Sequence, residues 1–594
     1  MHKPTNAVTF ATLVLAWLAL SPLAAVAAPV LFFSDLESGP KSGWEGSTTK
    51  GAAVTIWGKG LGAARGSSYV TVNGAQLTSA ADYAEWGAAG PARGLERITF
   101  WLNSVVQDGA GTISVTVNGA ASNALPFTVM DTKIYFISAA DGDNGYNGTR
   151  AAFGGGGNGP WRDIYKFKPT VNPSGETEPY IVYVRGGTYA TPDPDPSYSC
   201  LVCLRAPAAG SGTAATPKAI IGYPGETPVL DVAALTRGAF WVAQYSPYGR
   251  ASYYTYAKLE IRGAAAAGDQ AIALWGDQNR VIGNHLHDLL ADAWTGVVMV
   301  DNSQYSRLYG NLFQRNGFDS YKHNIYVKTH ARYIAGDKDA QYTYIGWNEF
   351  ADAVAADNRG GVIFVSKAGN TAADQYTRYL WIHDNYFHDG NMEFIYTGDN
   401  TALSDIYIYN NVFARGNTGT GPGLFLAWDS YNVSVYNNTF YRIGNPGGPM
   451  VSVTARAPTT ATFKNNIWYA QPGQAFLAVE NWLGASAASD HDLFFDPDGT
   501  TTLPAGAGIA VTNALTGDPL FIDAAAGDFH LQSGSPARNA GSAAVTSVVT
   551  ADFDGNPRPM DGAFDIGAFE YSGAYVPPPV DTTPPAAPTN LTVQ

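Results

Sequence analysis

An asparagine with an apolar residue two positions after it recurs along the middle of the chain. Successive copies are 27, 37, 37, 26, 27 and 28 residues apart: Asn284, Asn311, Asn348, Asn385, Asn411, Asn438 and Asn466. Each period also contains an apolar segment that reads as a short strand. These segments are Gln270–Asp277, Gly296–Ser303, His323–His330, Gly361–Ala368, Met392–Asp399, Gly423–Ser430 and Pro449–Arg456. In each of them we expect the third and fifth positions to face inward and the second, fourth and sixth to face outward.

One coil of several short strands per ~27 residues, with an asparagine at a fixed corner, predicts an all-β fold of the right-handed parallel β-helix type. The asparagine amides are expected to stack and to hydrogen-bond to one another along the solenoid. No helical periodicity recurs, which excludes helical solenoids, and a propeller blade needs ~40 residues. We expect this domain to span residues 131–572.

The closing part of that domain carries distinctive segments, Asp518–Asp523, Gly534–Arg538 and Asp552–Glu570. They resemble the C-terminal end of secreted bacterial β-helix proteins of the pectate-lyase superfamily. The resemblance implies the β-helix fold and an action on polysaccharides, but it leaves the reaction open because this fold carries lyases, hydrolases, epimerases and adhesins.

Residues 28–130 have a different pattern, in which apolar residues alternate and end in glycine turns, as in Gly51–Gly62 and Gly111–Gly119. This pattern predicts an immunoglobulin-like β-sandwich. The two segments resemble an IPT/TIG domain, which implies an accessory module without chemistry of its own.

The two ends of the chain indicate export. Residues 1–27 read as a secretory signal peptide with a cleavage site at Ala25–Ala27, and no later segment is apolar enough to insert into a membrane. Residues 573–594 read as a proline-rich linker followed by the start of a truncated module that resembles fibronectin type III. The protein is expected to be secreted, extracellular or on a bacterial cell surface. The two cysteines, Cys200 and Cys203, are then expected to form a local disulfide.

The amino-acid composition and net charge indicate which kinds of molecule the protein is expected to bind. The net charge is −15, which disfavours nucleic acids because phosphate contacts need clustered lysine and arginine. The 34 tyrosines and 14 tryptophans suit sugar binding. Six basic residues nevertheless fall between Lys322 and Lys367, which favours an acidic polysaccharide as substrate. A β-helix has no obligatory partner, so a monomer is expected.

The two long asparagine intervals place insertions after His323–His330 and Gly361–Ala368, and solenoid insertions gather on a binding face. The candidate catalytic residues are Lys328, Tyr326, His330, Arg359, Lys367 and His323, although His323 is expected on an inward-facing column. The candidate substrate-binding residues are Trp275, Trp428, Asn324, Glu393, Asp301 and Asp399. Trp275 and Trp428 are expected to share an outward column with Lys328, where a sugar chain would stack on both rings.

These residue types suit β-elimination from a uronic acid, which needs a base, a cation at the carboxylate and an acid for the leaving oxygen. Lys328 is the candidate base, Tyr326 the acid, and Arg359 or Lys367 the cation. The set loosely resembles the alginate-lyase and chondroitinase-B family, in which a lysine follows one strand and an arginine the next; here the second place holds Lys367. That family binds calcium through acids before its lysine. Asp319 is the only acid there, so Ca²⁺ is an open expectation and no other cofactor is predicted.

Two alternatives remain. A glycoside hydrolase needs two carboxyl groups ~5 Å or ~6.5–9.5 Å apart. Its candidates are Asp301, Asp352, Asp357, Glu393, Asp399 and Asp429. The other alternative is a non-catalytic polysaccharide-binding surface protein.

Overall fold

The computed structural model is all-β and describes most of the chain. The described residues are 28–168, 178–195, 198–204, 211–242, 250–263, 270–289, 295–317, 322–332, 337–353, 361–368, 371, 374–398, 403–416, 421–427, 429–454, 459–480 and 483–573. The predicted signal peptide and nearly all of the predicted linker lie outside these ranges. Within them, no helix has the length and apolar character needed to span a membrane.

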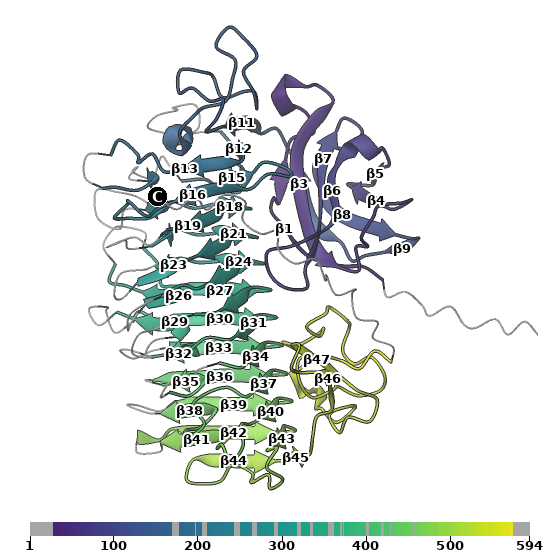
Figure 1. The fold of residues 1–594 in the computed structure, drawn as a ribbon, viewed down its shortest axis with the longest axis vertical. Coiled ribbons are helices and arrows are strands. Elements are labelled where there is room, and N and C mark those ends of the chain that lie inside the picture. The colour runs from purple at the N-terminus through teal and green to yellow at the C-terminus, as the bar shows by residue number, and fades with distance from the viewer. Residues whose placement is uncertain are drawn as a thin grey trace, which may run out of the picture.

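Three parallel sheets form the body of the molecule, and most coils contribute one strand to each sheet (Figure 1). In every sheet, hydrogen-bonded neighbours come from successive coils. The 13-stranded sheet consists of β11 (Lys133–Ile137), β12 (Tyr180–Val184), β15 (Lys218–Gly222), β18 (Tyr254–Ala257), β21 (Arg280–Ile282), β24 (Arg307–Tyr309), β27 (Gln341–Gly346), β30 (Thr377–His383), β33 (Leu403–Tyr409), β36 (Ser430–Tyr436), β39 (Thr460–Lys464), β42 (Ser486–Asp490) and β44 (Ile509–Thr512).

The 12-stranded sheet consists of β13 (Gly187–Tyr189), β16 (Pro228–Asp231), β19 (Glu260–Arg262), β22 (His285–His287), β25 (Leu312–Gln314), β28 (Glu349–Ala351), β31 (Tyr386–His388), β34 (Val412–Ala414), β37 (Thr439–Tyr441), β40 (Ile467–Tyr469), β43 (Leu493–Phe495) and β45 (Leu515–Thr516). The 10-stranded sheet consists of β14 (Val202–Leu204), β17 (Phe240–Val242), β20 (Ile272–Leu274), β23 (Thr295–Asp301), β26 (Lys322–Thr329), β29 (Gly361–Lys367), β32 (Glu393–Thr397), β35 (Leu424–Leu426), β38 (Val451–Thr454) and β41 (Leu477–Glu480). The predicted parallel β-helix is confirmed.

The asparagine ladder is also confirmed. The amide nitrogen of each ladder asparagine from Asn284 to Asn438 donates to the amide oxygen of the next one, over 2.9–3.0 Å. The same nitrogen also donates to a backbone carbonyl, so these fully buried amides are well satisfied. The ladder ends at a carboxylate, because the amide nitrogen of Asn466 donates to Oδ1 of Asp492 over 3.0 Å.

The inward columns follow the expected alternation in most coils but not in two. In Met392–Asp399 and Gly423–Ser430 the predicted register is wrong by one residue. Tyr396 was expected inward, yet it pairs with Phe364 and Phe425 in the outward column, while Ile395 pairs with Ile363 inside. Because side chains alternate with a period of two, this one-residue shift reverses the faces.

Strands β1 to β10 form two facing sheets at the N-terminus. One is β1 (Val30–Ser34), β3 (Lys50–Lys59), β7 (Glu96–Asn103) and β6 (Tyr83–Ala89). The other is β2 (Ser38–Gly39), β10 (Leu125–Val129), β8 (Gly109–Val117), β4 (Tyr69–Val72) and β5 (Ala75–Leu77), with β9 (Ala120–Ala121) beside β8. Their common core supports the predicted sandwich. The finer likeness to an IPT/TIG domain stays a prediction.

The sandwich packs against the first coils (Figure 1). Its core is continuous with outward residues of the 13-stranded sheet, such as Ile181 and Ile282. The buried guanidinium of Arg280 donates to the backbone oxygens of Ser34 and Asp35 over 2.6 and 2.8 Å. The two parts therefore share one apolar core and a set of buried hydrogen bonds.

A C-terminal module with β46 (Phe521–Asp523) and β47 (Asp528–Leu531) covers the outer face of the 12-stranded sheet in the later coils (Figure 1). It also reaches the sandwich, because Asp554 forms an ion pair with Lys59. His530 lies between Asp528 and Asp554, at 2.6 Å from each. Burial lowers the pKa of His530, but the two carboxylates outweigh it and raise the pKa to about 9.

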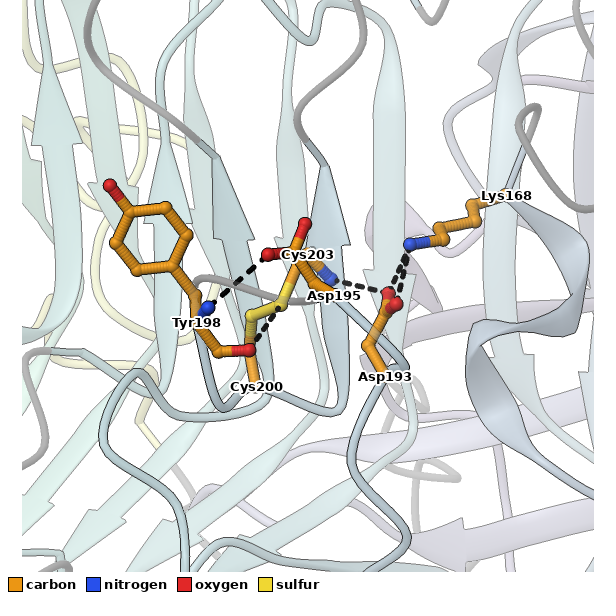
Figure 2. The surroundings of a disulfide bond; sticks show 6 residues. All are labelled: Lys168, Asp193, Asp195, Tyr198, Cys200 and Cys203. Carbon is orange, nitrogen blue, oxygen red and sulfur yellow. Dashed lines mark hydrogen bonds and ion pairs between the residues drawn. A yellow bond between two sulfur atoms is a disulfide. The ribbon is translucent and has the colours of Figure 1, made fainter.

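Cys200 and Cys203 form the predicted disulfide at the start of the 10-stranded sheet. Figure 2 shows the ion pair of Lys168 and Asp193 beside it. Lys168 Nζ lies 2.6 Å from Asp193 Oδ1, and the other carboxylate oxygen accepts the Cys203 backbone N–H over 3.0 Å. The buried pair and the disulfide therefore fix the same turn.

Candidate active site

The outer face of the 10-stranded sheet carries a column of apolar and aromatic side chains in successive coils. Met299, Tyr326, Phe364 and Tyr396 occupy equivalent positions on β23, β26, β29 and β32. The ring centroids of Tyr326 and Phe364 are 4.9 Å apart, and those of Phe364 and Tyr396 are 5.0 Å apart. This column holds the Tyr326 ring in place from both sides.

Lys328 lies two residues after Tyr326 on the same face of β26. Its Nζ is 4.8 Å from the centroid of the Tyr326 ring and 3.9 Å from Oδ2 of Asp301, which is the equivalent residue on the preceding coil. Lys328 is 7% exposed. Burial lowers its pKa, and the Asp301 carboxylate partly opposes this effect. A lysine in this environment is more readily neutral than one in water.

Asp301 also fixes the next candidate. Its Oδ2 lies 2.6 Å from Nδ1 of His330, and this contact fixes the orientation of the imidazole ring. The backbone of His330 is held at both ends, since its N–H donates to Asn302 and its carbonyl accepts from Gln375, each over 2.8 Å. The half-buried His330 is the most exposed of the candidates on β26 and in the residue directly after it.

The hydroxyl of Tyr326 has a partner on the following coil. It lies 2.7 Å from the Ser366 hydroxyl, and Ser366 occupies the position equivalent to Lys328. A second hydroxyl here can donate to the tyrosine oxygen, which would stabilise that oxygen after it lost its proton.

The expected inward orientation of His323 is wrong. Its ring packs against the outward-facing rings of Phe364 and Tyr326, with centroids 4.5 and 5.2 Å away. Nδ1 donates to the Gly361 carbonyl over 2.8 Å, and Nε2 is buried without a partner in the described structure. Burial, with a smaller effect from Lys328, lowers the pKa of His323 to about 3, so the ring is neutral.

The expected outward orientation of Asn324 is wrong as well. Its Oδ1 accepts a hydrogen bond from Asn316 over 2.9 Å, and both side chains are buried. The cause is an irregularity at the start of β26: Gly296 pairs with His323 and Val298 with Ile325, while the intervening pair is skipped. Asn324 therefore accepts a hydrogen bond from the buried amide of Asn316 at a corner of the solenoid.

Trp275 is not an exposed stacking surface. Its side chain is 1% exposed, and its indole N–H donates to Oδ1 of Asp337 over 2.9 Å. Asp337 in turn pairs with Arg250 at 3.3 Å, so the ring is part of a buried polar contact. The three candidates Arg359, Trp428 and Asp399 lie outside the described residues.

The other two described candidates lie on the strands that follow β26, and Lys367 pairs with Thr329 rather than with Lys328. Lys367 ends β29 and is 5% exposed, with its Nζ 5.9 Å from the Tyr376 ring centroid. Burial lowers its pKa, against the raising effect of Asp339 and Asp374. Glu393 begins β32 opposite Gly361 and is 7% exposed.

The hydrolase candidates that the structure describes, Asp301, Asp352, Glu393 and Asp429, do not form a hydrolytic pair on this face. Glu393 lies three coils from Asp301, which corresponds to about 14 Å along the solenoid. Asp352 follows β28 of the 12-stranded sheet, and Asp429 precedes β36 of the 13-stranded sheet. Asp357 lies outside the described residues, as does Asp319 of the expected calcium site. In the part of the chain that the structure describes, no three His, Cys, Asp or Glu side chains are arranged to hold a metal ion.

Comparison with known proteins gives remote likenesses. No protein-family model matches the sequence, and no curated protein is similar to it. Among solved structures, the chain is similar to a Yersinia enterocolitica family 28 exopolygalacturonase, at 12% identity over 83% of this chain and 97% of the other, with a TM-score of 0.43. A rhamnogalacturonan lyase matches at 13% identity over 66% and 90%, with a TM-score of 0.32. The A-module of an Azotobacter vinelandii mannuronan C-5 epimerase matches at 12% over 59% and 94%, with a TM-score of 0.31.

The sequence reasoning missed two members of the cluster, Ser366 and Phe364. Both lie on Gly361–Ala368, in the same columns as Lys328 and Tyr326. Comparing each candidate with its column neighbours in the next coil would have found them, since the register of these two coils was predicted correctly.

Proposed function

We propose that this chain is a secreted polysaccharide lyase that cleaves an acidic, uronic-acid-containing polysaccharide by β-elimination. The observation that carries the proposal is the position of Lys328, buried with a lowered pKa 4.8 Å from the Tyr326 ring on the same strand. A neutral amine and a phenol side by side supply the base and the acid that elimination needs. The disulfide and the predicted leader sequence support secretion.

In this proposal the neutral Lys328 amine takes the proton from the carbon next to the uronate carboxylate. The electron pair of that C–H bond forms a carbon–carbon double bond, and the bond to the glycosidic oxygen breaks. Tyr326 donates its proton to the leaving oxygen, and the Ser366 hydroxyl 2.7 Å away stabilises the resulting phenolate. Lys367, whose charged form Asp339 and Asp374 favour against the effect of burial, neutralises the uronate carboxylate. His330, oriented by Asp301, binds the sugar at the more exposed edge.

The arrangement of acids favours elimination over hydrolysis. A hydrolase needs its two carboxyl groups within ~9.5 Å, whereas Asp301 and Glu393 are about 14 Å apart along the solenoid. Asp301 is also engaged with His330. Among the acids named as hydrolase candidates, none that the structure describes therefore has a partner at this distance on this face.

The test is an assay for unsaturated uronate, which absorbs in the ultraviolet, with alginate, pectate, glycosaminoglycans and bacterial exopolysaccharides as substrates, with and without a chelator. Lys328→Ala is expected to lower kcat by at least about 10²-fold. Tyr326→Phe keeps the ring between its neighbours but removes the acid, and we expect a similar loss.

Two controls match these changes. Lys41→Ala removes a lysine of the N-terminal sandwich whose side chain is 32% exposed, and Ser366→Ala removes only the hydrogen-bond partner of Tyr326. We expect full activity for the first and a loss of less than about tenfold for the second. New reducing ends without ultraviolet absorbance would refute the lyase and favour hydrolysis, and polysaccharide binding without either product would favour the non-catalytic alternative.

A further inference from the structure

The outer face of the 13-stranded sheet carries aromatic rings midway along the solenoid, around β24, β27, β30 and β33 (Figure 1). Six of them form two stacks, one of Tyr305, Tyr342 and Tyr379 and the other of Tyr344, Trp381 and Tyr407. Within each stack, neighbouring centroids are 4.6–5.6 Å apart and neighbouring rings lie within 16° of parallel. The rings therefore face one another along the solenoid and turn their edges outward.

The polar groups of these six rings reach solvent. Tyr305 is 38% exposed, and the other five side chains are half-buried. Among the described residues, none of the five hydroxyls has a protein hydrogen-bond partner, nor has the indole N–H of Trp381, and none of these groups is buried. Aromatic edges with free hydrogen-bonding groups suit a ligand that is rich in hydroxyls.

The stack of Tyr305, Tyr342 and Tyr379, here called the tyrosine stack, lies at a corner where successive coils have a left-handed backbone. The φ angles of the three tyrosines are 59°, 56° and 57°. At the equivalent Asp405 and Asn432 of the next two coils, φ is 56°. Aspartate and asparagine adopt this conformation more readily than tyrosine does, so the backbone alone does not explain the tyrosines.

Arg378 connects the tyrosine stack with the candidate active site. Its guanidinium carbon lies 5.2 Å from the centroid of the Tyr379 ring and 5.5 Å from that of the Tyr376 ring. Nζ of Lys367 lies 5.9 Å from the same Tyr376 centroid. The corner between the 10-stranded and 13-stranded sheets therefore carries a continuous row of cationic and aromatic side chains.

The half-buried Arg378 is a cation without a counter-ion. No carboxylate in the described part of the chain pairs with it, and no described group accepts a hydrogen bond from it. Such a guanidinium favours an anionic ligand, and a carboxylate matches its planar edge. Asp405, which accepts hydrogen bonds from Ser404 and Asn432, would repel an anionic chain in the following coil. An anionic chain is therefore expected to run from Arg378 toward Tyr305.

We propose that Arg378 and the tyrosine stack bind the acidic polysaccharide beyond the candidate active site. The guanidinium pairs with a uronate carboxylate, and the phenol hydroxyls form hydrogen bonds with sugar hydroxyls. From Tyr379 to Tyr305 is roughly 10 Å along the solenoid, the length of about two sugar residues in an extended chain. The identity of the polymer rests on the proposed function, but binding here does not require that this chain cleave it.

The test is affinity electrophoresis of the full chain in native gels that contain alginate, polygalacturonate or hyaluronan. Lys328→Ala serves as the parent, so that elimination does not consume the polymer, and at least one polymer is expected to retard it. Adding Arg378→Gln should weaken binding about tenfold at low salt. Adding Tyr379→Asn should weaken it about threefold, and it keeps the fold because Asn432 occupies the same left-handed corner.

Arg442→Gln is the matched control. The guanidinium carbon of Arg442 lies 5.2 Å from the Tyr441 ring, but beside the 12-stranded sheet, so this variant should bind as the parent does. Equal retardation of Arg378→Gln and Arg442→Gln would overturn the proposal, and so would absence of retardation by all three polymers. A dimer in light scattering that Tyr379→Asn dissociates would assign the stack to a protein interface instead. Circular dichroism checks that each variant is folded.

The chain with Lys328 intact separates this proposal from the proposed function. If the ultraviolet-absorbing product forms, Arg378→Gln should raise KM more for the polymer than for its tetrasaccharide, and equal rises would overturn binding beyond the active site. If no product forms but Arg378→Gln still loses retardation, the elimination is refuted and the binding surface is supported.

Discussion

Replacing Asp492 by asparagine is expected to stabilise the protein at neutral and alkaline pH. Asp492 is fully buried at the end of the asparagine ladder, where Oδ1 accepts from the backbone and side chain of Asn466 and Oδ2 accepts from Ser489. Burial raises its pKa from 3.8 to about 7 despite these hydrogen bonds. At about 1.4 kcal/mol per pH unit, ionising this group costs the folded state about 4 kcal/mol.

The direction in which Asp492 changes the stability with pH follows from proton linkage. The folded protein holds this proton more tightly than the unfolded chain, so the contribution of Asp492 to stability is greatest below pH 4. It declines between pH 4 and 7 and stays low above pH 7. Asparagine has no charge to bury and continues the ladder, so Asp492→Asn should match the parent near pH 4 and exceed it by up to about 4 kcal/mol at pH 8.

The assay is thermal unfolding by calorimetry at pH 4, 5, 6, 7 and 8 with one scan rate. The matched control is Asp490→Asn, two residues away. Hydrogen bonds, among them those from Asn513 and Lys464, outweigh burial and lower the pKa of Asp490 to about 2. The stability that this carboxylate contributes is present above about pH 4 and is lost as the pH falls through about 2, so Asp490→Asn should destabilise the protein at all five pH values. Parallel pH curves for the parent and Asp492→Asn would refute the reasoning.

Three further outcomes are expected. The raised pKa of His530 gives stability that is complete below about pH 6.5 and lost as the pH rises through about 9, so His530→Gln should flatten the melting temperature between pH 7 and 10; an unchanged profile would contradict this. Lys168→Met should cost about 3–5 kcal/mol in chemical denaturation by leaving Asp193 buried and unpaired, and adding Asp193→Leu should recover much of the loss. Replacing Cys200 and Cys203 by serine opens a very short loop, so the loss should be about 2 kcal/mol, and a loss above about 4 would mean that the disulfide also holds tertiary contacts.

The fold was predictable because the solenoid repeats one physical requirement in every coil. A buried corner amide has to be satisfied, and an asparagine in the next coil satisfies it, so the same residue returns at Asn284 and six times more. The apolar residue two positions later is equally constrained, because its ring stacks inside the solenoid, as Phe313, Phe350 and Phe387 do at 4.9 and 4.6 Å. The corner asparagine and the apolar residue after it lie close together in the sequence and recur in every coil, so the sequence alone reveals them.

The register of the site was less predictable because it depends on single residues at corners. Glu393 rather than Met392 pairs with Gly361, and this offset of one residue exchanges the expected inward and outward faces of β32, which brings Tyr396 into the aromatic column. At the start of β26 the pairing with β23 skips Asn324. Here His323 faces outward and Asn324 faces inward, the reverse of what alternation predicts. Alternation alone assigns both of them wrongly.

The buried surroundings of two candidate residues distinguish their roles, which the sequence alone did not. Lys328 and Trp275 were expected in one outward column, and both are nearly inaccessible. Trp275 is buried without loss of a hydrogen bond, because its only polar group, the indole N–H, donates to Asp337. Burial disfavours the charge of Lys328, and Oδ2 of Asp301 is 3.9 Å from its Nζ, beyond direct hydrogen-bond distance. A buried tryptophan with a satisfied N–H has a structural role, whereas a buried lysine with a lowered pKa is a candidate for a chemical role, and the proposed elimination depends on Lys328 for this reason.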